Sequence, residues 1–490
     1  MRDLLFSVDK SSKRGLQSQI REILVSAILN GHLKPGERLP STRQMADRLD
    51  VSRNTVVLAY QLLIDGGYLQ TSERSGYFVN ETLIEMPSLA KEGLSASDQA
   101  VSNVDWASRI VRHPADQRNI EKPENWQQFR FPFIYGQSDP DLFPTSEWRE
   151  CVYRALGRKW LGTWSADTLD RDDEMLVEQI RSRILPRRGI LVGSEQILVT
   201  LGVQQGLYLL ANLLAGRGIK VAVEEPGYPD ARNIFRLATS DVGHLDVDGD
   251  GLVINEKLDG AGLVYTTPSH QLPTTVTMTP ERREALLKQA SERDFIIVED
   301  DYELETNYVD RPLPSLKSQD ADGRVIYLGS FSKTLFPGLR LGFLVAPPEF
   351  IKQARALRRL MVRHPPTSNQ SAAALFLSLG YYDVHVRKLH RIYRERWDVM
   401  GRALAHHMSD VQRPRSIGGS SYWLKVPAGI DTTTLAEAAM DQDVFIEPGS
   451  VYFDREPPPN NFLRLGFSSI PTERIDEGIE RLAGVMRQLG

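Results

Sequence analysis

Residues 325–345 read VIYLGSFSKTLFPGLRLGFLV, and this stretch decides the fold class of the larger part of the chain. Two apolar runs, 325–328 and 341–345, flank a loop that contains Lys333 and Arg340. Short apolar runs bounded by glycine and proline are typical of buried strands. Ligands of open α/β sheets bind beyond the carboxyl ends of the strands, so this loop is a predicted ligand-binding segment.

The sequence upstream of this stretch repeats the same pattern. Short apolar runs alternate with helical stretches, and they occupy residues 197–199, 221–223, 263–265 and 295–298. Near-continuous apolar strands that alternate with helices are typical of a parallel sheet covered on both faces. From about residue 128 onward, the sequence therefore predicts an α/β fold with a buried, mainly parallel sheet.

Polar and aromatic residues follow several of these runs. Val203 and Gln204 begin a helix after the first run, where backbone N–H groups could bind a phosphate. Tyr228 follows the second run, and Asp300 and Tyr302 follow the fourth. Each feature also has a purely structural interpretation, because a glycine turn is commonly only a turn, a loop tyrosine usually packs, and most lysines are exposed.

One cofactor accounts for these residues together. Pyridoxal phosphate (PLP) needs a lysine for its covalent attachment, a carboxylate beside its ring nitrogen, an aromatic platform and donors for its phosphate. A protonated pyridine ring is the stronger electron sink, so the carboxylate is part of the chemistry. The sequence therefore predicts a PLP site.

Residues 128–490 resemble the fold-type I aminotransferases. The resemblance rests on the motifs TLGVQQG, EEPGY, TPSHQLPT, VEDDYELE, GSFSKTLFPGLRLG and FLRLGFS. It implies that Lys333 forms the internal aldimine, that Asp300 pairs with the ring nitrogen and that Tyr302 donates to the ring oxygen. The resemblance also implies that the phosphate is bound by Val203, Gln204, Ser330 and Arg340. Tyr228 would stack on the ring, and Arg464 would bind the carboxylate of an amino compound. His270 or Gln271 would lie near the ring.

The first 80 residues differ in charge from the rest of the chain. They hold 11 Lys and Arg against 8 Asp and Glu, a net charge of +3, whereas the whole chain carries −5. A basic module at one end of an acidic chain suggests contact with a polyanion. This difference in net charge is small, so the prediction of a polyanion-binding module depends on the residue pattern.

Three helices and a hairpin are predicted in this segment. Ser41 and Gln44 have the spacing of a capping box, and Ser52 can cap the helix that follows. The expected helices end near Gly31, Leu49 and Gly66, and two short strands at 68–70 and 77–79 enclose a polar turn. The pattern is that of a winged helix-turn-helix.

A winged helix-turn-helix commonly reads DNA, and the alternative is a small helical packing domain with solvated arginines. Residues 14–80 resemble the GntR-type winged helix through the string LKPGERLPSTRQMADRLDVSRNTV and the later GYL and SGYFV. The resemblance implies a third helix that probes the major groove. It places DNA contacts at Ser41, Arg43, Ser52, Arg53, Thr55 and Gly76.

Residues 81–127 differ in composition from both neighbours. They contain scattered Ser, Asp, Asn and Pro, with one short helical stretch near 104–111, and they predict a linker. The expected domains are therefore a winged helix-turn-helix at 1–80 and an aminotransferase-like PLP domain at 128–490.

The composition of the 490 residues is that of a folded soluble protein, with 41% hydrophobic and 25% charged residues. Cys151 is the single cysteine, which excludes an internal disulfide and a Cys-rich zinc site. The first residues lack the apolar core of a secretion signal, and no run of about 18 apolar residues could span a bilayer. We expect a cytoplasmic protein with no membrane or metal partner.

A GntR-type reader joined to an aminotransferase-like domain resembles the MocR regulators. This family implies a homodimer that binds double-stranded promoter DNA and senses a small amine by external aldimine formation. Many members have a glycine-rich stretch where residues 164–173 of this chain read WSADTLDRDD. That variant resembles the taurine- and ectoine-responsive branch.

Two positions bear on the expected effector. Arg464 offers a planar guanidinium suited to one carboxylate or sulfonate. Asp230 occupies a place where the GABA-sensing member of the family has an arginine, and its carboxylate would repel a second anionic group. We expect a primary amine with one acid group, such as taurine or an ectoine-derived amino acid. The alternative function is an active aminotransferase that the winged helix tethers to DNA.

Overall fold

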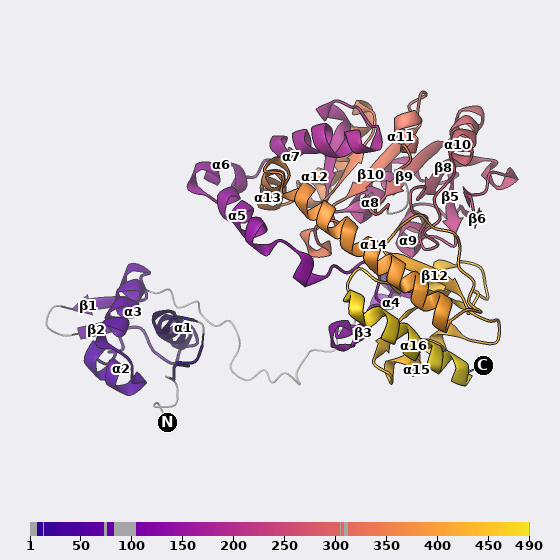
Figure 1. Cartoon of the computed structure of the whole chain (residues 1–490). Coiled ribbons are helices and arrows are strands. Elements are labelled where there is room, and N and C mark those ends of the chain that lie inside the picture. Colours follow the sequence, from indigo (N-terminus) through magenta and orange to yellow (C-terminus); the bar gives the residue numbers. More distant parts are fainter. Residues whose placement is uncertain are drawn as a thin grey trace. The chain divides into compact units, whose positions relative to one another are not determined.

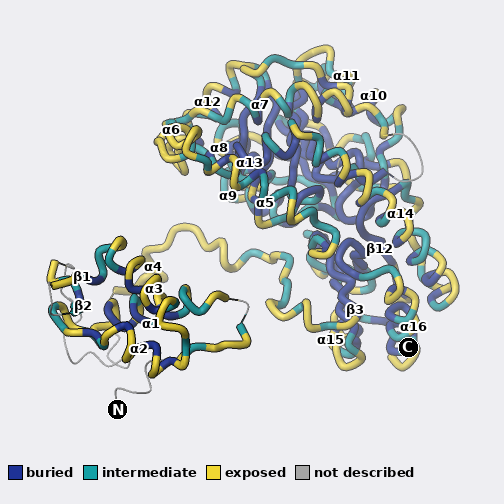
Figure 2. Tube along the Cα trace, turned by 60° about the vertical axis from the view of Figure 1, so that its left-hand side comes forward, coloured by how far each residue is buried: buried dark blue, intermediate teal, exposed yellow. Residues whose placement is uncertain are grey.

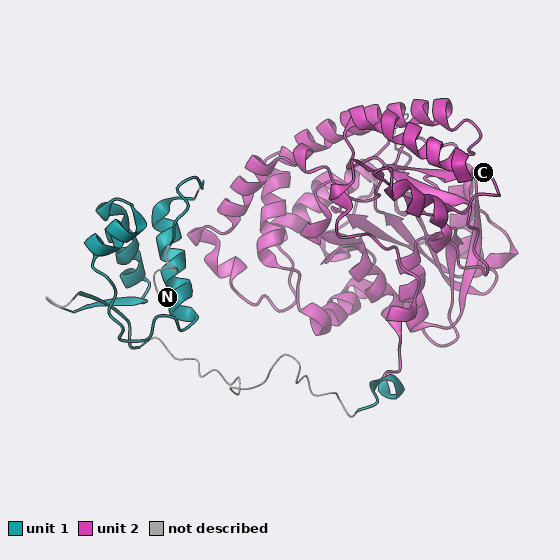
Figure 3. Ribbon diagram, turned by 90° about the horizontal axis from the view of Figure 1, so that it is seen from below, with its two compact units in different colours: residues 1–109 teal, residues 110–490 magenta. Residues whose placement is uncertain are grey.

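The computed structural model describes residues 7–12, 14–72, 76–82, 104–303, 305–307 and 312–489. The chain forms two compact units, residues 1–109 and 110–490, which Figure 3 shows in separate colours. The tip of the expected wing, 73–75, and residues 83–103 of the expected linker lie outside the described residues.

The first unit is the predicted winged helix-turn-helix. Its elements are α1 (Leu16–Leu29), α2 (Thr42–Leu49), α3 (Arg53–Asp65), β1 (Leu69–Ser72) and β2 (Gly76–Val79). The two strands pair antiparallel and form the base of the wing. Ile20, Met45, Val56 and Val79 come from four of these elements and share one buried apolar core. Burial of these side chains holds the small unit together.

The second unit is built on an eight-stranded sheet (Figure 1). Its strands are β4 (Ile197–Thr200), β5 (Lys220–Glu225), β6 (Val242–Asp248), β7 (Gly251–Leu252), β8 (Ala261–Thr266), β9 (Ile296–Asp301), β10 (Val325–Ser330) and β11 (Gly342–Val345). Their order is β4-β11-β10-β9-β8-β5-β6-β7. The pairs from β10 through β9, β8 and β5 to β6 are parallel, whereas β11 is antiparallel to β10 and β4. The predicted mainly parallel sheet is confirmed, and β6 and β7 extend it.

Helices cover both faces of this sheet. The helices of this part of the chain are α5 (Thr145–Ala155), α6 (Leu161–Trp164), α7 (Glu174–Gln179), α8 (Val203–Leu214), α9 (Pro229–Ala238), α10 (Pro280–Arg293), α11 (Leu316–Gln319), α12 (Pro348–Val362), α13 (Thr367–Ser378) and α14 (Tyr381–His407). Successive side chains of a strand point to opposite faces. On β4, Leu198 shares a core with Leu207 of α8, whereas Val199 shares another core with Phe376 of α13. Figure 2 shows this buried interior in dark blue.

The C-terminal part contains a second, smaller sheet that was not predicted from the sequence. β12 (Ser421–Lys425), β15 (Phe462–Gly466) and β14 (Glu447–Pro448) form it, and β13 (Val444–Phe445) pairs separately with β3 (Phe131–Pro132). Helix α14 packs there with α15 (Thr432–Met440) and α16 (Thr472–Leu489) around one large core. In the small sheet, Arg464 lies opposite Trp423 on one side and Glu447 on the other.

The expected linker is only partly separate from the second domain. It contains the short helix α4 (Trp106–Arg109), and residues from 110 onward belong to the second compact unit. Asn233 Nδ2 donates at 2.9 Å to the carbonyl oxygen of Arg118 and to Oδ1 of Asn119. Residues 117–119, which lie within the expected linker, therefore pack against α9 of the second unit.

Candidate functional site

A cavity of about 180 Å³ lies where β9 and β10 end and α8 begins. Its lining residues are Tyr135, Val203, Gln204, Tyr228, Leu272, Asp300, Tyr302, Ser330, Ser332, Lys333, Pro337 and Arg340. The carboxyl ends of parallel strands meet at one edge of the sheet, which is where ligands bind in open α/β folds. The fold thus gathers residues that the sequence keeps more than a hundred positions apart.

The two acids at the end of β9 have different surroundings. Asp301 Oδ2 accepts hydrogen bonds from Arg188 Nε at 2.6 Å and from the Tyr327 hydroxyl at 2.8 Å, so its charge is paired with an arginine inside the protein, although its Oδ1 has no partner among the described residues. Asp300 accepts only from the Tyr265 hydroxyl, at 2.7 Å, and its buried Oδ1 has no hydrogen-bond partner among the described residues. Burial raises the pKa of Asp300 to about 7. A cationic N–H in the cavity would satisfy this carboxylate.

One end of the cavity is suited to an anion. Helix α8 begins there after Gly202, whose φ of 82° lies in the region that favours glycine, and the first backbone N–H groups of a helix are free to bind an anion. Arg340 Nη2 reaches across to the carbonyl oxygen of Leu201 at 3.0 Å. Ser330 Oγ, which accepts from the Ser332 N–H at 3.1 Å, lines the same cavity. This set of donors fits a phosphate.

Lys333 has the properties of a reactive amine. Its Nζ lies 4.1 Å from the ring centroid of Tyr135, inside the cavity lining. Burial, together with the positive charge of Lys122, lowers the pKa of Lys333 to about 7. A lysine with such a pKa is largely neutral at slightly alkaline pH. The neutral amine is the form that can attack a carbonyl group as a nucleophile.

Arg464 lies completely buried beside the cavity. Its Nε donates to Ser421 Oγ at 2.9 Å, and its Nη1 donates to the Tyr452 hydroxyl at 3.3 Å. Its guanidinium carbon stacks 3.2 Å from the ring centroid of Tyr135, which lines the cavity. Nη2 is buried without a hydrogen-bond partner among the described residues. The contacts fix the plane of the guanidinium and leave one donor for a ligand.

Asp230 is held beside the predicted stacking ring. Its Oδ2 accepts from the Tyr228 hydroxyl at 3.0 Å and from Gln204 Nε2. Tyr228 and Gln204 line the cavity, whereas Asp230 lies one contact behind them. The carboxylate therefore fixes the tyrosine ring and adds negative charge near this wall.

His270 and Gln271 are not among the residues that line the cavity. Gln271 Nε2 donates to the carbonyl oxygens of Pro226 and Leu272, both at 2.8 Å, so its amide is occupied. His270 is buried, and burial lowers its pKa. Leu272, the next residue along the chain, lines the cavity. The Tyr302 hydroxyl, by contrast, is buried without a partner in the described part of the chain.

Three residues near the site were missed by the sequence reading. Tyr135 lines the cavity, Glu447 lies opposite Arg464, and Lys122 donates to the carbonyl oxygen of Tyr135. Gly136, with a φ of 77°, follows Tyr135 and lies against Lys333. The apolar run before this glycine was the available signal for Tyr135. Nothing in the local sequence marks Lys122 or Glu447.

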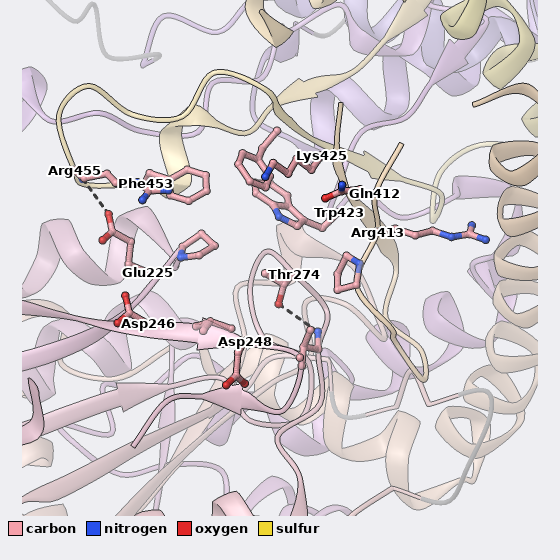
Figure 4. Close-up of a pocket in the computed structure, with 16 residues that line it drawn as sticks. Glu225, Asp246, Asp248, Thr274, Gln412, Arg413, Trp423, Lys425, Phe453 and Arg455 are labelled. Carbon is pink, nitrogen blue, oxygen red and sulfur yellow. Dashed lines mark hydrogen bonds between the residues drawn. The ribbon is translucent and has the colours of Figure 1, made fainter. Parts of the chain in front are cut away.

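A larger cavity, of about 480 Å³, is lined in part by Glu225 and Pro226 of the turn that precedes Tyr228 (Figure 4). Glu225 on its wall accepts from the backbone N–H groups of Asp454 and Arg455, and Asp248 pairs with Arg282. No lining side chain within the described residues has a buried polar atom without a partner. This cavity therefore offers less chemistry than the smaller one.

The predicted DNA contacts lie on the first unit. Ser41 Oγ accepts from the Gln44 N–H at 3.3 Å, and Ser52 Oγ accepts from the Thr55 N–H at 3.1 Å, so both caps form. Arg53 begins α3 and is exposed. The other predicted contacts are exposed Arg43 on α2 and half-buried Gly76 at the start of β2. The structure brings the helix-turn-helix contacts to the N-terminal ends of α2 and α3.

The fold and the cavity define the class of this protein. Residues 16–79 match the model of the gntR family of bacterial regulatory proteins, and residues 166–482 match that of the class I and II aminotransferases. The second unit has the fold of the fold-type I PLP-dependent transferases. LysN, an α-aminoadipate aminotransferase of Thermus thermophilus crystallised with N-(5′-phosphopyridoxyl)-L-leucine, has a TM-score of 0.71 and 29% identity over 79% of this chain and 99% of its own.

Relatives with both domains specify the family. The chain is 44% identical to the HTH-type transcriptional regulator TauR of Rhodobacter capsulatus, over 98% of this chain and 99% of that protein. It is 32% identical to the probable rhizopine catabolism regulatory protein MocR of Rhizobium meliloti, over 97% and 94%. The chain belongs to the MocR-type transcriptional regulators, and its similarity to TauR supports the taurine branch. Among the described residues, no helix is long and apolar enough to cross a membrane, and no acidic, His or Cys cluster could hold a metal.

Proposed function

We propose that this regulator binds promoter DNA through its first unit and senses a small amine in the PLP cavity of its second unit. The observation that carries the proposal is the cavity itself. Lys333, the unpaired Oδ1 of Asp300 and the anion-binding end at α8 surround one space of about 180 Å³. These groups match the aldehyde, the ring nitrogen and the phosphate of PLP.

The residues present fit the cofactor in detail. Asp300 would hold the proton on the ring nitrogen, and Tyr228 would stack on the ring. The α8 N-terminus, Ser330 and Arg340 would bind the phosphate. When bound, PLP supplies an aldehyde carbon that reacts with primary amines. Lys333 would hold that carbon until an effector amine replaces it.

The effector is proposed to carry a single acid group. Arg464 keeps its Nη2 unpaired, and this donor would receive a carboxylate or a sulfonate. Asp230 places a negative charge beside Tyr228, where a second acid group of a dicarboxylate would be repelled. Taurine or an ectoine-derived amino acid satisfies both conditions. The name of the relative TauR supports the same choice.

A homodimer is also proposed. Large apolar side chains are exposed in two stretches of the second unit, at Tyr153, Leu156, Trp160 and Leu161 and again at Leu360, Met361 and Val362. Arg363 pairs with Asp167, which connects the end of α12 to the segment after α6. Exposed apolar side chains in such numbers are typical of protein interfaces. Because the first unit needs chromosomal DNA, we propose that the dimer acts in the cytoplasm.

A second candidate function is amino-group transfer. The cavity retains the lysine and the aspartate that transamination uses, Arg464 lies beside it, and its fold relatives include aminotransferases. Two measurements separate the functions. A regulator shifts its cofactor absorbance with an amine and changes its affinity for promoter DNA, with negligible keto-acid or aldehyde product. Steady product formation without any change in DNA binding would favour the enzyme.

The effector proposal is tested on the purified protein loaded with PLP. Taurine, GABA, diaminobutyrate derivatives and glutamate are titrated while the cofactor absorbance is recorded. We expect one amine with a single acid group to bind tightest, and we expect Arg464→Ala to weaken that binding at least tenfold. Equal responses of the parent and of Arg464→Ala would overturn the role of this arginine.

A further inference from the structure

Three cationic side chains surround the ring of Tyr135. Arg464 Cζ lies 3.2 Å from the ring centroid, Lys333 Nζ lies 4.1 Å from it, and Lys122 Nζ lies 5.6 Å from it. Lys333 and Arg464 have roles in the proposed function. Lys122 comes from residues 110–127, which the sequence reading assigned to a linker, and has no role there.

Specific contacts hold the Lys122 side chain in this position. Its Nζ donates to the carbonyl oxygen of Tyr135 and lies 3.8 Å from Oε1 of Glu447. Glu447 Oε2 in turn accepts from the Tyr135 N–H at 2.8 Å. The Lys122 side chain is 28% exposed and that of Glu447 is 5% exposed. A mostly buried lysine needs such partners, because an unpaired charge is costly to bury.

The amine of Lys122 lies close to the reactive lysine. A Cβ atom placed on Gly136 would lie 3.6 Å from Lys122 Nζ and would collide with Lys333 Nζ. Both amines therefore approach the same glycine. The positive charge of Lys122 is also among the causes, after burial, of the lowered pKa of Lys333.

The charges near Tyr135 leave room for one anion. Glu447 lies opposite Arg464 in the small sheet and near Lys122, so one carboxylate lies beside two basic side chains. Its Oε1 is buried without a hydrogen bond among the described residues, and so is Nη2 of Arg464. Arg464 Nη2 is therefore a buried cationic donor that remains for a ligand. A monoanionic group could accept from this donor, whereas a neutral amine without an acid group would leave it unpaired.

We propose that Lys122 is a recognition residue of the effector pocket, where it acts with Arg464 on the acid group of the effector. This inference rests on the proposed function and deepens it. A guanidinium presents two parallel donors, and an ammonium group adds a donor from another direction. A sulfonate has three oxygens and a carboxylate has two, so this pair of cations favours an amino sulfonate over the matching amino carboxylate.

The same residue ties the segment before the domain to the effector pocket. Besides Lys122, that segment is held by Arg118, whose guanidinium pairs with Glu456, and by the amide contacts of Asn233. The Arg118–Glu456 pair is exposed, and exposed ion pairs contribute little to stability. Lys122 links residues 110–127 to the buried charges beside Tyr135.

The test compares Lys122→Met and Lys122→Arg with the parent, all as full-length protein loaded with PLP. Affinity for taurine, for β-alanine and for uncharged propylamine is read from the cofactor absorbance. We expect Lys122→Met to bind taurine at least tenfold more weakly, β-alanine less affected, and propylamine within twofold of the parent. Lys122→Arg should recover most of the taurine affinity, because it restores the charge.

A second readout requires neither cofactor nor effector. Hydrogen exchange of residues 110–127 should be faster in apo Lys122→Met than in the apo parent, and unchanged in Lys288→Met, an exposed lysine on α10. A parent that responds to no amine overturns the proposed function. A parent that responds, with Lys122→Met binding taurine equally well, overturns this inference alone. If Lys122→Met loses its fold, Lys122→Gln replaces it, with the same criteria.

Discussion

Tyr265 donates its hydroxyl hydrogen to Oδ2 of Asp300 at 2.7 Å, and this bond leaves Oδ1 as the unpaired atom of a buried carboxylate. In the proposed cofactor site, this unpaired atom would accept from the ring nitrogen of PLP. Asp300→Asn keeps the shape and can still accept from Tyr265, but it has no charge. We expect it to retain PLP at least tenfold more weakly, with an altered absorbance spectrum, as measured by dialysis and spectroscopy.

Two control measurements accompany this prediction. Tyr265→Phe removes the orienting bond and leaves the charge, so it should retain the cofactor better than Asp300→Asn does. Binding of promoter DNA by the apo protein should be the same in both variants and the parent, because the first unit is a separate compact unit. Equal PLP retention in Asp300→Asn and the parent would remove Asp300 from the cofactor site.

The pKa of Lys333 predicts the pH at which the cofactor attaches. Burial lowers this pKa from 10.5 to about 7, so the neutral amine becomes the main form as the pH rises above 7. The rate at which PLP attaches to the apo protein should therefore rise between pH 6 and pH 8, a range set by that value, and then level off. Lys333→Ala should show no borohydride-fixed cofactor. A rate that keeps rising toward pH 10 would contradict the lowered pKa.

Gly136 has little space for any side chain. Its φ is 77°, and an added Cβ would collide with Lys333 Nζ. Gly136→Ala should lower the unfolding free energy by about 1–2 kcal/mol, the usual cost of this conformation, and should impair cofactor attachment. Thermal unfolding and absorbance measure the two effects. Gly162→Ala is the control, since a Cβ there meets no atom within 4 Å; similar behaviour of both variants would refute the prediction.

The features that could be predicted from the sequence are those that depend on a local pattern of residues. Apolar runs predicted the strands β4, β5, β8, β9, β10 and β11, because a strand buried on both faces must be apolar throughout. Residues at strand ends, such as Asp300 and Lys333, followed from the same rule. Lys122 and Glu447 could not be predicted in this way, since they meet only through the tertiary fold, 325 positions apart in the chain. His270 and Gln271 were placed near the ring by resemblance; neither lines the cavity, whereas the neighbouring Leu272 does.

Arg53 begins the predicted recognition helix and is exposed. A lost bidentate contact with a base typically costs about 1–3 kcal/mol. Arg53→Ala should therefore bind the promoter site about 5- to 150-fold more weakly in a fluorescence anisotropy titration, with an unchanged cofactor spectrum. Arg217→Ala, which removes an exposed arginine from the second unit, should bind like the parent. Unchanged specific affinity of Arg53→Ala would exclude this residue from the reading surface.

The charge and position of Asp230 allow a prediction of which effectors the pocket rejects. Its carboxylate accepts from the Tyr228 hydroxyl and from Gln204, so Asp230→Asn can keep these contacts while losing the charge. Repulsion of a second acid group should then disappear. We expect glutamate to bind Asp230→Asn at least fivefold more tightly than it binds the parent, while the affinity for taurine changes less than twofold. Raising the salt concentration should reduce the difference between the two proteins, since screening weakens the repulsion. Tightest binding of glutamate by the parent would show that Asp230 does not select against dicarboxylates.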